Sequence, residues 1–192
     1  MKSLLYLIII VLSIESCEKK SHNLIEQKTE KEEKVFVPKI GKKFFEYDFI
    51  DYYKSDYDEY SVLKLEENKN KSKADKLKFD VVVGNFPENI TQTNFLESMN
   101  KIGFTKQEIP KNKFREIDKI FIDKTIDESG TYACIAVYRD ILVFKNQGKI
   151  VGIAKICFSC KQHQIIGTNV NTDNFGQNGD YDKLNTLLSQ NN

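Results

Sequence analysis

Residues 141–158 read ILVFKNQGKIVGIAKICF, and this stretch decides the fold. Both halves are rich in β-branched and aromatic residues, and KNQGK between them carries the glycine typical of a β-hairpin connection. Residues 131–138, TYACIAVY, extend the first half with the same composition. Both faces of the two strands are apolar. We therefore expect the hairpin at the centre of an antiparallel sheet, with helices covering one face.

The connection also predicts a register for the hairpin. With residues 146–148 as a three-residue loop, counting back along both strands places Cys134 opposite Cys160. Opposed residues have Cβ atoms about 4.5–5.5 Å apart, against about 3.8 Å in a disulfide. A bridge between these two cysteines is therefore within reach after a small adjustment. A Cys157–Cys160 bridge instead requires the strand to end and the chain to turn there.

Three interpretations stay open for the CxxC spacing in residues 156–160, ICFSC. The first is a structural disulfide between two of Cys134, Cys157 and Cys160, which suits an exported protein. The second is a redox pair, although such a pair normally opens a helix, whereas this one ends a strand. The third is a tetrahedral Zn²⁺ site made by the three cysteines and His163. One thiol is left over after any single bridge.

Helices and a further strand are expected around the hairpin. In chain order, the apolar spacing predicts a helix near residues 91–102, a helix over 110–121, a strand at 164–168 and a helix over 181–188. Gly103 suits a helix end, Pro110 a helix start and Asp180 an N-cap. Residues 77–86 fit either a helix or a strand. The fold class that follows is α+β, with two or three helices packed beside the sheet.

The first residues have the form of a secretory signal peptide. Residues 1–3, MKS, supply a short positive start, and residues 4–12, LLYLIIIVL, are apolar without a break. At about 1.5 Å per residue this run cannot cross a hydrocarbon core of about 30 Å, which needs about 20 residues. We therefore expect residues 1–16 to be an export signal.

The expected signal ends in IESC, residues 14–17, which resembles the lipobox of bacterial lipoproteins. In that motif a small residue precedes a cysteine that is lipidated and becomes the new N-terminus. Ser16 suits the motif, and Glu15 departs from it. The resemblance implies that Cys17 carries acyl chains, and each buried CH₂ group contributes about 0.8 kcal/mol to membrane binding.

The composition changes after the cysteine. Residues 17–34 hold the lipidated Cys17 and then EKKSHNLIEQKTEKEEK, which is charged, lacks an apolar period and predicts a tether. Residues 35–192 are then a single globular domain. The whole chain has 29 Lys and Arg against 28 Asp and Glu. This balance argues against a nucleic-acid partner.

Parts of the hairpin also resemble a known group of proteins. The residues concerned are 138–144 (YRDILVF), 148–151 (GKIV) and 156–160 (ICFSC). They are similar to small lipoproteins of the Bacteroidetes that carry a hairpin closing in an Ile-Cys-Phe-x-Cys run. The resemblance covers about a third of the chain, roughly residues 134–181. It implies the hairpin and an exported lipoprotein, and it brings no activity and no catalytic residue.

Sequence motifs of common enzymes are absent: the chain has no GxSxG, phosphate-binding loop, HExxH or dinucleotide fingerprint. Arg139 is a candidate ligand contact, because a guanidinium can hold a carboxylate or phosphate by two hydrogen bonds. We expect a non-enzymatic lipoprotein of the cell envelope, without a cofactor, that binds an envelope protein or a small ligand. One alternative is a thiol-redox or metal-binding protein that uses Cys134, Cys157, Cys160 and His163. Another is an immunity-type lipoprotein that neutralises a toxin.

Lipidation of Cys17 can be tested by a Cys17→Ala variant expressed with its leader. We expect the parent chain in the membrane fraction, labelled by an alkyne fatty acid, and the variant without label and released from the membrane, because the acyl chains supply the attachment. Fractionation and in-gel fluorescence measure both. A Cys157→Ser variant serves as the control and should stay membrane-bound. Membrane binding of the unlabelled Cys17→Ala chain would contradict the prediction.

Overall fold

The computed structural model describes residues 37, 39–126 and 133–190. The expected signal peptide (1–16) and the expected lipidated Cys17 with its tether (17–34) lie outside these residues. Within the described part, no helix is long and apolar enough to span a membrane.

A five-stranded antiparallel sheet forms the centre of the domain, with strand order β3-β2-β5-β6-β7. The strands are β2 (Phe49–Lys54), β3 (Thr105–Glu108), β5 (Asp140–Asn146), β6 (Lys149–Cys157) and β7 (Gln162–Ile166). A separate small sheet pairs β1 (Ile40–Lys43) with β4 (Ile122–Lys124). The predicted hairpin is β5–β6, and β5 is the middle strand. The α+β class with an antiparallel sheet built around the hairpin is confirmed.

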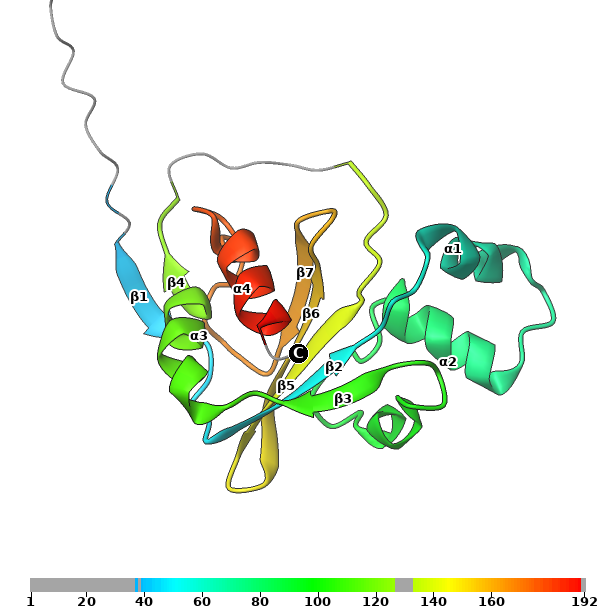
Figure 1. Cartoon of the computed structure of the whole chain (residues 1–192), viewed down its shortest axis with the longest axis horizontal. Helices are drawn as coiled ribbons and strands as arrows, with labels where there is room; N and C mark the ends of the chain where they lie inside the picture. Colours follow the sequence, from blue (N-terminus) through cyan, green and yellow to red (C-terminus); the bar gives the residue numbers. More distant parts are fainter. Residues whose placement is uncertain (1–36, 38, 127–132, 191–192) are drawn as a thin grey trace, which may run out of the picture. The chain divides into compact units, whose positions relative to one another are not determined.

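Helices cover both faces of the sheet, whereas the sequence predicted cover on one face. They are α1 (Glu59–Glu67), α2 (Lys73–Val82), α3 (Phe114–Ile120) and α4 (Asp180–Ser189), with short 3₁₀ turns at Asn94–Ser98 and Lys111–Lys113. Figure 1 shows α1 and α2 on one side of the sheet, and α3 and α4 on the other. The hairpin strands are apolar on both faces, so each face must be removed from water.

Each face therefore has its own buried core. The core under α3 and α4 is rich in aromatic rings, which include Phe44, Phe45, Phe121, Phe144, Phe175 and Tyr181. The core under α1 and α2 is largely aliphatic and includes Val62, Val81, Val82, Met99, Ile102 and Ile141. Together the two cores account for most of the buried apolar side chains of the domain.

The β5–β6 turn is tighter than the sequence predicted. Asn146 pairs with Lys149, so the loop consists of Gln147 and Gly148 alone. Their φ angles are 49° and 76°, which is the left-handed pair of a type I′ turn. The expected three-residue loop over 146–148 is therefore wrong. The two-residue turn matches the right-handed twist of the strands better.

A bulge next to the turn shifts the register further. Lys145 pairs with Ile150, but Phe144 pairs with Gly152. A Cβ atom at residue 152 would lie 2.2 Å from the ring of Phe45, so glycine is what allows this ring to pack on the sheet. The centroids of Phe45 and Phe144 are 4.7 Å apart. The predicted register, with Cys134 directly opposite Cys160, is wrong for this reason.

The expected strand over residues 131–138 is also wrong in its described part, because β5 begins only at Asp140. The backbone N–H of Tyr138 donates to the carbonyl of Val82, at the end of α2, over 2.8 Å. The backbone N–H of Tyr138 thus finds its acceptor at the end of a helix, before the chain enters the sheet. In the described part of this segment Val137 and Tyr138 are buried, whereas residues 133–135 are exposed, so the apolar composition predicted neither the backbone conformation nor the burial of its first residues.

Of the remaining element predictions, some are confirmed and some are wrong. Residues 110–121 form a 3₁₀ turn followed by α3, and the last predicted strand and helix correspond to β7 and α4. The helix near 91–102 is only a 3₁₀ turn, and Gly103 after it has φ of 92°. Residues 77–86, left open by their pattern, are helical to Val82. The N-cap of α4 is Gly179, and Asp180 is the first helical residue.

Lys155, in β6, is the most buried lysine described, with 1% of its surface exposed. Its Nζ donates to the carbonyl oxygens of Gly84 (2.7 Å) and Phe86 (3.0 Å). It also lies 4.5 Å from the ring centroid of Tyr138. Lys155 thus ties the loop after α2 to the sheet. Burial lowers the pKa of its ammonium group to about 7.

The Lys155 ammonium should make stability depend on pH. Its pKa in the unfolded chain is near 10.5, so between about pH 7 and 10 the unfolded chain binds the extra proton. The free energy of unfolding should therefore rise with pH by up to about 1.4 kcal/mol per unit. A Lys155→Met variant should lack this rise. Urea unfolding of both proteins at pH 7, 8 and 9 measures it, and equal slopes would contradict the assignment.

Candidate functional site

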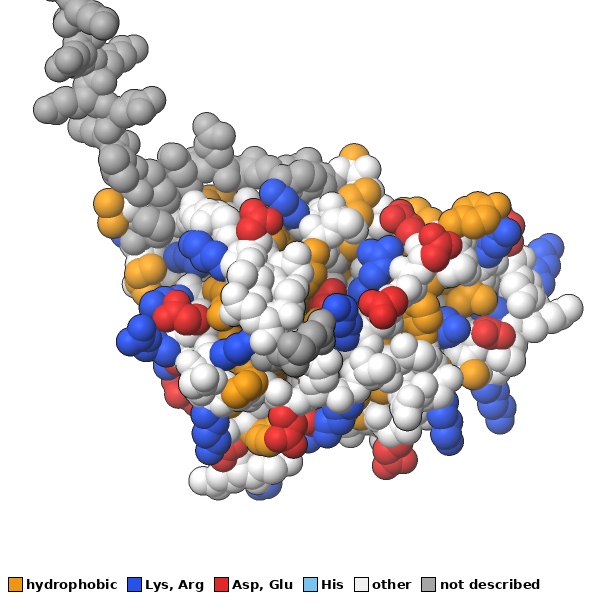
Figure 2. Space-filling model, in the orientation of Figure 1, with side chains coloured by type: hydrophobic (Ala, Val, Ile, Leu, Met, Phe, Trp, Pro, Cys, Tyr) orange, Lys and Arg blue, Asp and Glu red, His pale blue; other side chains and the backbone are white. Residues whose placement is uncertain are grey.

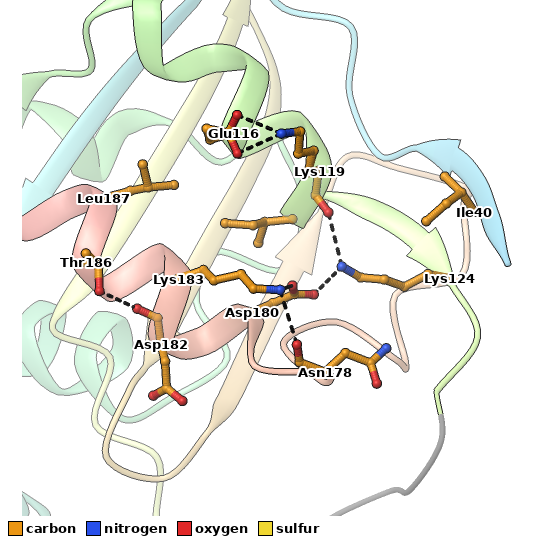
Figure 3. A pocket seen from close by; sticks show the side chains of 11 residues that line it. Ile40, Glu116, Lys119, Lys124, Asn178, Asp180, Asp182, Lys183, Thr186 and Leu187 are labelled. Carbon is orange, nitrogen blue, oxygen red and sulfur yellow. Dashed lines mark hydrogen bonds and ion pairs between the residues drawn. The ribbon is translucent and has the colours of Figure 1, made fainter. Parts of the chain in front are cut away.

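A cavity of 790 Å³ lies beside α3, α4, β1 and β4. Its volume falls in the range of small-molecule sites, about 300–1,000 Å³. Ile40, Ile120 and Leu187 form its apolar wall, and charged residues of α3, β4 and α4 form its polar wall. Figure 3 shows these side chains converging from the two helices and the small sheet.

A buried ion pair between Lys124 and Asp180 forms part of the polar wall. Their side chains are only 6% and 2% exposed. Lys124 Nζ also donates to the carbonyl of Lys119 at 3.1 Å, and the exposed Lys183 approaches the other oxygen of Asp180 at 3.5 Å. Asp180 sits in the first turn of α4, where the helix dipole favours a negative charge. The Lys124 ammonium therefore joins β4 to α4 through the carboxylate and to α3 through the carbonyl of Lys119.

The charges around the cavity balance. Lys119, Lys124 and Lys183 are set against the acids Glu116, Asp180 and Asp182. On α3, Lys119 pairs with Glu116 at 2.7 Å. Asp182 points away from the buried ion pair in Figure 3. With no net charge on its wall, the cavity offers chiefly apolar surface to a ligand.

Sequence reasoning missed this site. The sequence indicated Asp180 only as a helix N-cap, and it indicated no role for Lys124. A lysine that ends a three-residue strand carries no local signal of burial, because its partner lies in α4, far along the chain. The helical spacing of Ile120 and Leu187 was visible, yet it does not show which apolar side chains border a cavity.

The three domain cysteines lie outside both cores, and two of them, Cys157 and Cys160, form a small buried cluster with Tyr138. The structure joins Cys134 and Cys160 in a disulfide with a Cα–Cα distance of 6.1 Å, and Cys157 is a buried free thiol. The bridge starts from a loop residue, and not from a strand position opposite Cys160. The CxxC residues Cys157 and Cys160 are not joined to each other.

His163 lies apart from the cysteines. His163 pairs with Ile156 across β6–β7, so their side chains share one face of the sheet. Cys157 is the next residue on β6, so the side chain of Cys157 points to the opposite face from that of His163. The structure thus does not bring together the four expected zinc ligands. Within the described residues, no three His, Cys, Asp or Glu side chains gather as a metal site.

The ring of His163 is instead part of the aromatic core. Its Nδ1 lies 2.9 Å from the hydroxyl of Tyr181, and its Nε2 lies 3.2 Å from the carbonyl of Thr172. Burial lowers the pKa of His163, which favours the neutral ring. In that state the tyrosine hydroxyl donates to Nδ1, and Nε2–H donates to the carbonyl.

Arg139, the candidate ligand contact, lies just before β5 and does not line the cavity. Its Nε donates to the backbone carbonyl of Tyr57 over 2.7 Å, so it helps to hold the chain between β2 and α1. The next residue, Asp140, is buried and accepts a hydrogen bond from the hydroxyl of Tyr52. Burial raises the pKa of Asp140. The side chains of Arg139 and Asp140 thus both form hydrogen bonds within the protein.

The face of the molecule drawn in Figure 2 mixes the two signs of charge. Figure 2 shows Lys and Arg side chains interspersed with Asp and Glu over the face in view, without a continuous region of one sign.

Comparisons of the chain with models of protein families, with curated proteins and with solved structures found no match.

The Lys124–Asp180 pair should be a main support of the cavity wall. A Lys124→Met variant leaves a buried carboxylate with only the distant, exposed Lys183, and should lower the free energy of unfolding by about 3–5 kcal/mol. Replacing both partners, Lys124→Met with Asp180→Leu, should recover most of that loss. Urea unfolding measures each value.

The matched control is the exposed ion pair between Lys76 and Asp80 on α2, at 2.7 Å. Lys76→Met should change the free energy of unfolding by less than about 0.5 kcal/mol. If Lys124→Met costs no more than Lys76→Met, the pair does not support the wall.

Proposed function

We propose that this chain is an exported, lipid-anchored binding domain of the bacterial cell envelope that carries out no reaction itself. It holds the apolar part of a ligand in the cavity beside α3 and α4. The observation that carries the proposal is the 790 Å³ cavity, whose apolar wall is backed by a buried ion pair. The expected leader, the lipobox-like Cys17 and the charged tether support the location.

The chemistry of the wall selects the class of ligand. Ile40 is 65% exposed and lies beside Ile120 and Leu187, so apolar surface stays in contact with water until a ligand covers it. Covering it stabilises a complex by about 25 cal/mol per Å². The charged side chains around the cavity sum to zero. A ligand with an apolar body and an uncharged or zwitterionic head therefore suits this cavity.

The rigid support of the cavity also favours binding. Lys124 and Asp180 join the end of the small sheet to α4, and α3 contributes a carbonyl to the same network. A cavity whose wall is fixed before the ligand arrives loses less conformational entropy on binding. The absence of enzyme motifs from the sequence agrees with a binding role.

Two tryptophan variants on α4 test the proposal, since the chain itself has no Trp. Thr186→Trp places a bulky ring at the cavity, whereas Asn185→Trp places it on a neighbouring exposed position that does not line the cavity. Native mass spectrometry of the full chain, extracted from membranes in mild detergent, should show a bound small molecule in the parent and in Asn185→Trp. Occupancy should fall at least tenfold in Thr186→Trp.

Equal occupancy in the two variants would place the ligand elsewhere and overturn the role of the cavity. A parent chain that carries no small molecule at all, even with added single-chain zwitterionic amphiphile, would overturn the binding function itself.

A further inference from the structure

The three cysteines meet at one end of β6, where Cys160 is bonded to Cys134 and shares a buried cluster with Cys157. The strand ends at Cys157, β7 begins at Gln162, and these two residues pair across the hairpin. Residues 158–161 make the connection, and Lys161 has φ of 47°. The strand thus ends and the chain turns between Cys157 and Cys160, which is the condition that a bridge between them requires.

A connection of this length allows Cys157 to lie within disulfide range of Cys160, and the two residues belong to one buried cluster. Four-residue hairpin connections are most often built around a type I turn, whose first and fourth Cα atoms lie within about 7 Å. Disulfides span Cα–Cα distances of about 4.4–6.8 Å. The existing partner, Cys134, is 6.1 Å from Cys160. Cys160 is therefore placed to bond with either cysteine.

Burial differs sharply among the three cysteine residues. Cys157 and Cys160 are 1% and 4% exposed and belong to one buried cluster with Tyr138. Cys134 is exposed. The disulfide in the structure therefore consumes the exposed cysteine and leaves the buried one free. A bridge between the two buried cysteines would do the opposite.

Polar groups already surround the free thiol. The backbone N–H of Val137 donates to Cys157 Sγ over 3.4 Å, and the hydroxyl of Ser159 lies 3.4 Å from the same sulfur. These contacts hold the sulfur at the turn that carries Cys160. They also place donors next to the negative charge that a thiol acquires when it attacks a disulfide.

We propose that Cys160 exchanges its disulfide partner between Cys134 and Cys157. The thiolate of Cys157 attacks Sγ of Cys160, the bond from Cys157 to Cys160 forms, and the bond from Cys160 to Cys134 breaks. The electron pair leaves on the sulfur of Cys134, which takes up the proton that Cys157 released. No oxidant or reductant is consumed. The product carries an exposed thiol at Cys134 that can form a mixed disulfide with a disulfide-bearing partner.

Trypsin separates the two pairings cleanly. Cleavage after Lys124, Arg139, Lys155 and Lys161 places Cys134 in residues 125–139 and both other cysteines in residues 156–161. In the pairing of the structure the two peptides are cross-linked, and the free thiol lies in 156–161. After exchange, 156–161 holds an internal bridge, and the free thiol lies in 125–139.

The experiment treats the folded, oxidised full chain with N-ethylmaleimide and maps the adduct by mass spectrometry. We expect at least tenfold more adduct on residues 125–139 than on 156–161, because only the exchanged form exposes its thiol. The same chain labelled in denaturant at low pH, where exchange is quenched, should carry the adduct on 156–161. Native labelling confined to 156–161, or no native adduct on 125–139, would overturn the exchange.

Two variants isolate the step. Cys157→Ser removes the attacking sulfur, so it should keep the Cys134–Cys160 bridge and take no adduct on 125–139 under native conditions. Cys134→Ser should form the Cys157–Cys160 bridge when incubated with oxidised glutathione. Circular dichroism checks that both variants fold. A folded Cys134→Ser chain that keeps both thiols free would refute the proposal, and the ligand cavity would be unaffected by that result.

Discussion

The apolar character of both faces of the β5–β6 hairpin is the constraint on which the rest of the structure depends. A strand pair of this kind cannot lie at an edge or face water on one side, so β2 and β7 flank it and helices cover both faces. The aromatic core under α3 and α4 and the aliphatic core under α1 and α2 are the consequence. The cavity arises at the border of the aromatic core, where two helices meet the small β1–β4 sheet and do not fill the space between them.

Charged side chains inside the domain have defined partners that hold separate elements together. Lys155 joins the loop after α2 to the sheet through two carbonyl groups. Lys124 and Asp180 join β4 to α4 beside the cavity. A buried charge is costly unless it is paired or hydrogen-bonded, so each such group restricts the arrangements that the surrounding elements can adopt. At the cavity this restriction is useful, because it fixes the shape of the wall.

Several elements could be predicted from the sequence because their determinants are local. The hairpin, the segment containing α3 and the C-terminal helix follow from apolar spacing and from glycine and proline at their ends. The sequence located the turn to within one residue. The bulge beyond it lies where Phe45 packs against Gly152, a contact between distant parts of the chain that apolar spacing does not reveal. Residues 133–139 show the same limit. Their apolar composition predicted a buried strand, but residues 133–135 are exposed, the N–H of Tyr138 donates to a carbonyl at the end of α2, and no strand forms.

The sequence by itself determined the class of fold, the central position of the hairpin and the expectation of export, since all of these rest on composition and periodicity along the chain. The expectation of lipidation rests on the resemblance of residues 14–17 to a lipobox. Only the tertiary structure decided which charges are buried together, where the cavity lies and which cysteine is left free. These properties depend on contacts between residues far apart in sequence, such as Lys124 with Asp180 and Cys134 with Cys160. Alternation along a strand separates His163 from Cys157, although the two are close in sequence, because neighbouring side chains point to opposite faces of a sheet.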